Sequence, residues 1–368
     1  MKNIVILATG GTIAGAGEQG KNIGYKSGSI EAQTLIDAVP ELKNVANIFV
    51  EQVCNINSDD ITSEIWISLA LRIKELSEFG FGASHEKVDG FVIMHGTDTM
   101  EETAFFLSLA LGVGANCNGQ TAAKPVVLTG SMRPATAAEP DGPANLLFAV
   151  CSAVKLSSRN VISAGACPEH SRRMPESSRD HHSSFAKSMP VFVAFAGKLM
   201  DARSVQKIHA NDLDAFAEVG DRSVILSPFD KLRVNSVEGS QNNHLAPIFD
   251  VSSLQSLPKV SILYFNADAD AELVRFAAKR SAGLVIAGAG AGEFSQSWAV
   301  AIADVLAEKK IPVVISTRIN RGCIVPEQLL VPGTIAAYDL PPAKAAVLLR
   351  LALTETHDFV EIQKFFNE

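Results

Sequence analysis

The feature that most constrains the fold is an alternation of short apolar runs with longer segments of helical periodicity. The apolar runs, bounded by Gly, Asp or Thr, predict buried strands at Ile4–Ala8, Phe91–Met94, Val126–Leu128, Val191–Phe195, Val260–Phe265, Gly283–Ala287 and Pro312–Ile315. The helical patterns lie at Ser63–Leu76, Met100–Leu111, Ala271–Arg280 and Trp298–Lys309. Strand–helix alternation of this kind is typical of α/β folds with parallel sheets.

Two polar stretches interrupt the alternation. With 368 residues the chain can form one large domain and a smaller one. The polar stretch Val224–Asn243 predicts the boundary, which gives an N-terminal domain at 1–223, a linker at 224–250 and a C-terminal domain at 251–368. The other stretch, Ser163–Ser188, is rich in Ser, Arg, His and Pro and predicts a surface loop or a disordered segment.

Charge and apolar content exclude several classes of function. The formal net charge is −8 and no long Lys/Arg run occurs, which argues against a nucleic-acid surface. No run approaches the roughly 18 apolar residues that a membrane span needs. The apolar run after Met1 is also too short for a signal peptide. We therefore expect a cytoplasmic protein without membrane contact, or a periplasmic one if a leader is missing.

Cysteine and histidine spacing predicts no metal site. The five cysteines are scattered without a Cys-x-x-Cys spacing, which predicts reduced thiols. Three of the eight histidines fall within Ser163–Ser188, where matching ligands at ordered spacing are lacking. Gly15–Gly20 fits the pattern GxGxxG, but it begins six residues after the strand and opens no helix. We interpret these glycines as hinges of a lid, and expect neither metal nor cofactor.

Hydroxyl and carboxylate side chains are concentrated where three predicted elements end. The segments are Thr9–Thr12, Asn57–Asp60 and His95–Thr99. In open α/β sheets, ligands bind beyond the carboxyl ends of the strands. A Thr after a Gly-Gly turn exposes its hydroxyl among backbone N–H groups that can hold an oxyanion. Such a hydroxyl needs a base, and Asp98 together with a lysine or tyrosine is the chemistry available.

Each of these motifs also has a purely structural interpretation. A Gly-Gly-Thr turn alone is more often structural than catalytic, and the third motif could be only the start of a helix. Thr99–Glu102 fits a capping box, so we expect a helix to begin directly after Thr99. We expect His95 to be a packed, hydrogen-bonded residue rather than a catalytic base.

Taken together, the segments resemble a known family. ILATGGTIAG (Ile6–Gly15) and DGFVIMHGTDTMEETAFFL (Asp89–Leu107) are similar to the two signature segments of bacterial L-asparaginases. The similarity continues in order through Glu51–Asp60, Thr129–Thr136, Asp141–Leu146 and the segments LPKVSILYFNADAD, STRINRGCIVPE and LALTET. It covers nearly the whole chain and is closest to the high-affinity, usually exported type. Ser163–Ser188 is an insertion relative to the family.

The resemblance implies a fold and an activity. It implies a homotetramer with sites at subunit interfaces, each subunit having a larger flavodoxin-like N-terminal domain with a parallel sheet and a smaller α/β C-terminal domain. The implied reaction is the cofactor-free hydrolysis of L-asparagine to L-aspartate and ammonia through an acyl-enzyme.

It also implies roles for five catalytic residues. Thr12 corresponds to the nucleophile and Tyr25 to the lid tyrosine. Thr97, Asp98 and Lys207 correspond to a relay that activates water in the second step. The group that deprotonates Thr12 stays open, because Tyr25 and the lysine relay are both candidates.

Substrate contacts follow from the same resemblance. Ser58 and Asp59 correspond to the positions that hold the α-carboxylate and α-amino groups. Asp268 stands where many relatives have Asn, at the point where a neighbouring subunit reaches the site, and Glu327 is a second candidate contact of this kind. Gly11, Thr97 and Asp98 complete the predicted substrate-binding set.

Three other functions compete with this prediction. The first is a glutaminase-asparaginase that uses both amides. The second is the glutaminase-type subunit of a tRNA amidotransferase, although that branch carries an extra domain ahead of this fold, where here Met1 leads directly into the first strand. The third is a non-catalytic module that binds acidic amino acids, which the retention of five catalytic groups disfavours.

Overall fold

In the computed structural model, the described residues are 1–21, 24, 26, 28–111, 124–158, 191–219 and 249–367. The insertion predicted at Ser163–Ser188 lies outside them, as do Tyr25 and most of the linker predicted at 224–250. The domain boundary therefore stays a prediction.

A six-stranded sheet forms the larger, N-terminal domain, with strand order β2-β1-β3-β4-β5-β6. The strands are β1 (Lys2–Gly10), β2 (Ala46–Ile56), β3 (Gly90–Met94), β4 (Val126–Thr129), β5 (Val191–Phe195) and β6 (Lys198–Asp201). All neighbours pair in parallel except β5 and β6, which are antiparallel. The order 2-1-3-4-5 is that of flavodoxin-like sheets, and the predicted fold is confirmed.

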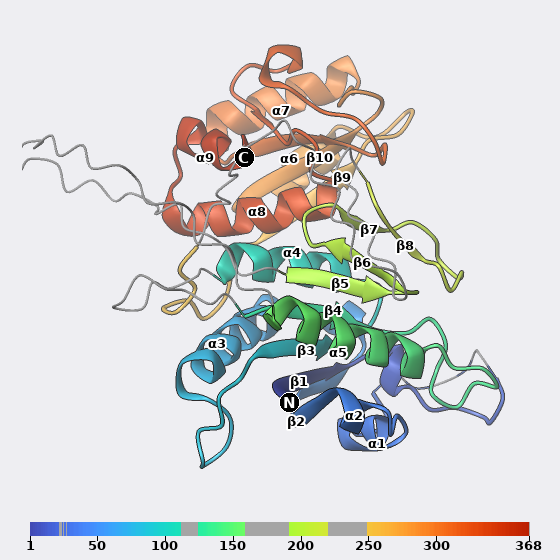
Figure 1. The fold of residues 1–368 in the computed structure, drawn as a ribbon. Coiled ribbons are helices and arrows are strands. Elements are labelled where there is room, and N and C mark those ends of the chain that lie inside the picture. The colour runs from blue at the N-terminus through green and yellow to red at the C-terminus, as the bar shows by residue number, and fades with distance from the viewer. Residues whose placement is uncertain are drawn as a thin grey trace, which may run out of the picture.

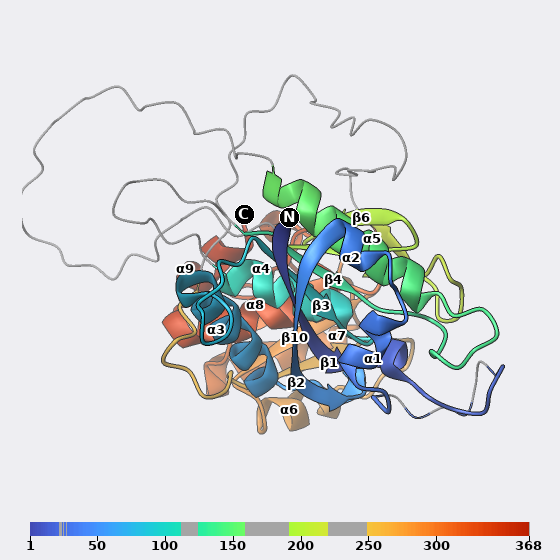
Figure 2. The ribbon, with the colours of Figure 1, turned by 60° about the horizontal axis from the view of Figure 1, so that its bottom comes forward.

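Alternating side chains of β1 explain how helices cover both faces of this sheet. Val5 and Leu7 belong to one buried cluster with residues of α3 and α4, whereas Ile4 and Ile6 belong to another with residues of α1, α2 and α5. The helices are α1 (Ala32–Asp37), α2 (Leu42–Val45), α3 (Ser63–Phe79), α4 (Met100–Ala110) and α5 (Gly142–Ser158). Figures 1 and 2 show α3 and α5 on opposite sides of the sheet. A strand buried on both faces must be apolar throughout, as this one is.

A parallel four-stranded sheet in the order β12-β11-β10-β9 forms the smaller, C-terminal domain. Its strands are β9 (Val260–Tyr264), β10 (Gly283–Gly288), β11 (Val313–Thr317) and β12 (Ile335–Ala336). Its helices are α6 (Glu272–Ala278), α7 (Gln296–Lys309), α8 (Pro342–Glu355) and α9 (Phe359–Phe366). The α6 and α7 side chains cover one face, and α8 packs on the other.

Helix α8 also packs against α4, so the two domains meet along these helices (Figure 1). One buried cluster runs from β1 through α4 and α8 to β10. Beside this contact lies a small antiparallel hairpin made of β7 (Val205–Lys207) and β8 (Phe216–Glu218). In the described part of the chain, no helix is long and apolar enough to cross a membrane.

Candidate active site

The polar turns Thr9–Thr12 and His95–Thr99 meet because β1 and β3 are parallel neighbours in the sheet, with their carboxyl ends at one edge. Gly11 follows β1 with φ of 79°, in the left-handed region that favours glycine. A β-carbon on Gly11 would stand 2.4 Å from both N and Cα of Gly96, the second residue after β3. Thr12 and Thr97 are therefore the residues directly after two backbones in contact.

The turn Asn57–Asp60 packs against Gly96 at the same point. A β-carbon on Gly96 would stand 2.7 Å from Ser58 Oγ. Ser58 is 2% exposed, and its hydroxyl has no hydrogen-bond partner among the described residues. A buried hydroxyl without a hydrogen-bond partner costs free energy, and a polar group of a bound ligand would remove this cost.

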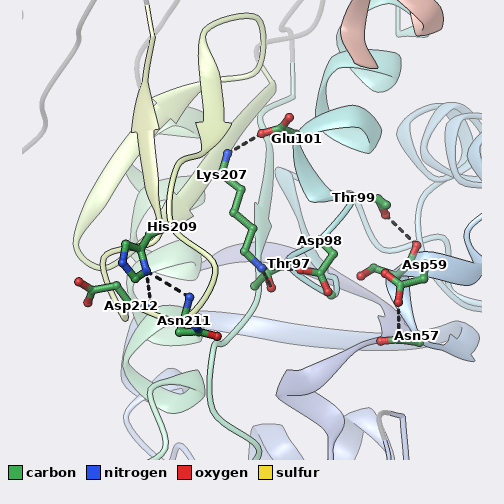
Figure 3. Close-up of polar contacts among 12 residues, drawn as sticks. Asn57, Asp59, Thr97, Asp98, Thr99, Glu101, Lys207, His209, Asn211 and Asp212 are labelled. Atoms are coloured by element: carbon green, nitrogen blue, oxygen red, sulfur yellow. Dashed lines mark hydrogen bonds and ion pairs between the residues drawn. The ribbon is translucent and has the colours of Figure 1, made fainter. Parts of the chain in front are cut away.

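Thr99 joins the turn Asn57–Asp60 to the start of α4. The capping box predicted at Thr99–Glu102 is wrong. The helix begins at Met100 as expected, but the Thr99 side chain does not cap it. Instead, Thr99 Oγ1 donates a hydrogen bond to the carbonyl oxygen of Ser58 at 2.8 Å (Figure 3). The hydroxyl thereby joins two turns of the site, a tertiary contact that competes with the local capping box.

Lys207, at the end of β7, reaches the turn His95–Thr99. Its Nζ donates to Thr97 Oγ1 at 2.9 Å and to Asp98 Oδ1 at 2.5 Å (Figure 3). The lysine side chain is 15% exposed and that of Asp98 is 57% exposed, so the ion pair lies at the edge of solvent. The structure thus brings Lys207 into contact with two other predicted site residues, although it lies 110 positions after Thr97 in the sequence.

The backbone of Lys207 is held by a residue that the sequence analysis did not single out. Lys207 N–H donates to Glu101 Oε2 at 2.5 Å. Burial raises the pKa of Glu101, while the charges of Lys344 and Lys207 act in the opposite direction. The only sequence signal was its place three residues after Asp98, in the first turn of α4.

Thr12 and Asp59 lie at the same edge. Thr12 opens the 3-10 helix Thr12–Ala14 and is 9% exposed. Asp59 lies in the 3-10 helix Ser58–Asp60; it is exposed and accepts a hydrogen bond from Asn57 Nδ2 at 2.8 Å (Figure 3). Tyr25 falls outside the described residues.

Two candidates lie in the other domain. Asp268 is exposed in the loop after β9, with φ of 61°, and Glu327 is exposed in the 3-10 helix Pro326–Gln328. Neither is among the residues that hydrogen-bond to Lys207 in the described chain. Their predicted contact with the site of a neighbouring subunit stays a prediction.

His95 is a packed residue, as predicted. Its Nε2 is 3.0 Å from Thr103 Oγ1, which accepts a bond from Trp66 Nε1 and so has its own hydrogen to donate. Its Nδ1 is then free to donate to the Gly96 carbonyl oxygen at 2.7 Å. Burial lowers the pKa of His95 to about 4, so the ring is neutral at pH 7 and supports the Gly96 turn from beneath.

The arrangement offers hydroxyls, two acidic side chains and one lysine along one sheet edge. In the described part of the chain, no group of three or more His, Cys, Asp or Glu side chains could hold a metal ion. The chemistry within reach of these residues is attack by a hydroxyl oxygen, with proton transfer through Lys207 and electrostatic support from Asp98.

Two family models match most of the chain. The family model "Asparaginase, N-terminal" matches residues 3–164, and "Glutaminase/Asparaginase C-terminal domain" matches residues 259–366. L-asparaginase 2 of Bacillus subtilis is 37% identical, with coverage of 100% of this chain and 87% of that protein. L-asparaginase 2 of Escherichia coli is 35% identical over 100% and 93%.

Two further matches bear on specificity and fold. The glutaminase-asparaginase of Pseudomonas fluorescens is 33% identical, with coverage of 100% of this chain and 91% of that protein. A crystal structure described as a probable cytoplasmic L-asparaginase from Campylobacter jejuni matches with a TM-score of 0.79. It is 36% identical and covers 100% of this chain and 99% of its own.

Proposed function

The chain belongs to the asparaginase family, and on that premise we propose that it is an L-asparaginase, an amidohydrolase that converts L-asparagine to L-aspartate and ammonia. One observation carries the assignment to this site. Lys207 contacts both Thr97 and Asp98, and Thr97 follows Gly96, whose backbone contacts Gly11, the residue before Thr12.

In the proposed first step, Thr12 is the nucleophile. Its Oγ attacks the side-chain amide carbon of asparagine, and the C–N bond breaks. The hydroxyl proton passes to the departing nitrogen, which leaves as ammonia, and an ester joins Thr12 to the aspartyl group. The proton travels through Tyr25 or through the Lys207 relay.

In the second step, water cleaves the ester. Asp98 holds the Lys207 amino group against Thr97, so a proton of the attacking water can pass through the Thr97 hydroxyl into this relay. The water oxygen bonds to the acyl carbon, and Thr12 Oγ leaves with a proton. The products are aspartate and the free threonine hydroxyl.

Ser58 and Asp59 are proposed to hold the amino-acid end of the substrate. The Ser58 hydroxyl has no hydrogen-bond partner among the described residues and can donate to the α-carboxylate. Asp59 presents an exposed carboxylate on the same 3-10 helix and can accept from the α-ammonium group. A ligand that carries both charges is thereby oriented with its side chain toward Thr12.

A homotetramer is the proposed assembly, with Asp268 and Glu327 reaching the site of a neighbouring subunit. Large apolar side chains in the segments on both sides of Asp268 support this: Tyr264 is 62% exposed, Leu273 49% and Phe276 60%. Large exposed apolar surfaces are typical of protein interfaces.

The similarity to the Campylobacter protein described as a probable cytoplasmic L-asparaginase supports a cytoplasmic location. A periplasmic location, as in the description of the Haemophilus influenzae relative, is the alternative that cell fractionation would separate.

Ammonia release from purified protein tests the function. We expect Thr12→Ala to lower kcat/KM for asparagine by roughly a thousandfold or more, because no other hydroxyl replaces the nucleophile. Thr12→Ser keeps an attacking hydroxyl and is the matched control, so it should retain far more activity. Activity of Thr12→Ala within tenfold of wild type would refute the assignment.

The same assay separates the two amide specificities. The similarity to a glutaminase-asparaginase keeps use of both amides as the second candidate function. A kcat/KM for asparagine well above that for glutamine supports the L-asparaginase assignment, and comparable values support the alternative.

A further inference from the structure

A buried lysine from the C-terminal domain holds the segment that leads to Lys207. Lys344, in the first turn of α8, is 0% exposed. Its Nζ donates three hydrogen bonds, to the carbonyl oxygens of Ala202 at 2.9 Å, Arg203 at 2.8 Å and Val205 at 2.6 Å. All three acceptors lie between the end of β6 and the start of β7, the strand that ends at Lys207.

The fold alone gives little reason for this lysine. An ammonium group has three donors, and all three are used here on backbone carbonyls rather than on a carboxylate. Burial lowers the pKa of Lys344 to about 8, which shows that the surroundings disfavour the charge despite the nearby Glu101. A buried charge is costly compared with a well-packed apolar side chain of the same size. A position that retains such a group is more readily explained by what the group holds.

What it holds is a small element that needs anchoring. Strand β7 has three residues and pairs only with β8 in the described chain, so it belongs to neither large sheet. Val205 packs into the buried cluster between the domains, and Lys207 N–H donates to Glu101 on α4. Helices α4 and α8 pack together, so the strand is held from both sides of the contact between the domains.

We propose that Lys344 is a positioning residue for asparagine hydrolysis. By fixing the backbone of residues 202–205, it keeps Lys207 Nζ at hydrogen-bond distance from both Thr97 and Asp98, the contacts drawn in Figure 3. Lys344 bonds to backbone carbonyls, not to Thr97 or Asp98, and it acts through β7. The inference rests on the proposed role of Lys207 in the relay.

The test replaces Lys344 by methionine, which has a similar length and no donor. A displacement of about 1 Å can cost a catalytic group on the order of a hundredfold in rate. We expect Lys344→Met to lower kcat for asparagine by about tenfold to a hundredfold. KM should stay within about threefold, because Ser58 and Asp59 are untouched. Lys344→Gln keeps two N–H donors and should lie between wild type and Lys344→Met.

A matched control is available on the opposite edge of the sheet. Lys124, just before β4, also donates from a partly buried Nζ to a backbone carbonyl, that of Ser77 at 2.5 Å. Lys124→Met removes the same kind of bond at the amino end of the strands, away from Lys207. We expect it to lower the melting temperature without lowering kcat by more than about twofold.

A double-mutant cycle separates positioning from general loss of stability. With Lys207→Ala already present, Lys344→Met should change the residual kcat, measured at high enzyme concentration, by less than about twofold, because the group it positions is gone. An equal loss of kcat in both backgrounds, an effect on KM alone, or no effect would overturn the inference. If Lys344→Met does not fold, Lys344→Gln enters the same cycle. Near-wild-type activity of Lys207→Ala would instead refute the proposed relay.

Discussion

Gly11, Gly96 and Ser58 are in contact at the point where three turns meet, and no side chain separates the backbones of the two glycines. The distance between Thr12 and Thr97 is therefore set by two residues that lack a β-carbon. Gly11 additionally requires a left-handed backbone. In a site where the nucleophile and the relay must act on one carbonyl carbon, the absence of side chains is as important as the reactive groups.

The close contact between Gly11 and Gly96 predicts the effect of Gly11→Ala. The new β-carbon would stand 2.4 Å from Gly96, so one of the two turns must move. We expect a loss of kcat/KM of at least about a hundredfold, because the displacement separates Thr12 from Thr97. The melting temperature should also fall, through the steric clash and the left-handed φ. Steady-state kinetics and thermal unfolding measure the two effects.

Gly82→Ala is the matched control. Gly82 lies in the turn after α3 and has a similar φ of 69°, but a β-carbon there would meet nothing within 4 Å. Its backbone strain should cost about 1 kcal/mol with activity within about threefold of wild type. If Gly11→Ala behaved like Gly82→Ala, the contact with Gly96 would not determine the site.

Single residues show where sequence analysis succeeds at this scale. A packed, hydrogen-bonded His95 is predicted from the sequence and confirmed by the structure. The cap at Thr99 was wrong because a tertiary acceptor, the Ser58 carbonyl, took the hydroxyl. Lys344 could not be found, since a lysine in an amphipathic helix ordinarily faces solvent, and only the fold shows which carbonyls surround it.

At the scale of elements, continuous apolar runs predicted strands well, and Val191–Phe195 is β5 without any shift. The polar segment Asn57–Asp60 is expected to follow a strand, but the bounds of that strand, β2, are not predicted. It is the outermost strand and only partly buried, so its sequence lacks a continuous apolar run. The hairpin β7–β8 was missed because three residues are too few to show a period. Lys207 could therefore be assigned only through the family resemblance.

The contact between α4 and α8 yields a prediction of pH dependence. Burial, together with Glu101, raises the pKa of Glu102 from 4.5 to about 7, and the charges of Arg350 and Lys344 oppose this only in part. Between pH 4.5 and 7 the folded state therefore binds more protons than the unfolded state. The stability that Glu102 contributes is therefore fully present below pH 4.5 and is lost as the pH rises through 7.

Glu102→Gln removes this titration. We expect the variant to be more stable than wild type at pH 8, by up to about 3 kcal/mol, with the difference shrinking as the pH falls towards 4.5. Urea denaturation at pH 5 and pH 8, at fixed protein concentration, measures it. Glu308→Gln, which changes an exposed carboxylate on α7, should keep the wild-type pH dependence. A variant that is less stable at pH 8 than at pH 5, relative to wild type, would contradict the sign.

At the scale of the whole molecule, the site depends on both domains although most of its residues lie in one. The buried cluster that joins β1 to β10 passes through α4 and α8, and Lys344 extends this contact to the β7 strand. Asp268 and Glu327, in contrast, lie in the smaller domain, and neither hydrogen-bonds to Lys207 within the described residues. Their proposed role requires a second subunit.

Mixing two inactive variants tests whether one site is built from two subunits. Thr12→Ala lacks the nucleophile but keeps Asp268, whereas Asp268→Ala keeps Thr12 and lacks the carboxylate that it would lend to its neighbour. We expect each to be nearly inactive alone. After dissociation and joint reassembly, a random mixture should place an intact Thr12 beside an intact Asp268 in about a quarter of the sites. Ammonia release should then recover to about a quarter of the wild-type rate, while size-exclusion chromatography with light scattering reports a tetramer. Full activity of Asp268→Ala by itself, or a reassembled tetramer that stays inactive, would show that each subunit completes its own site without Asp268 of its neighbour.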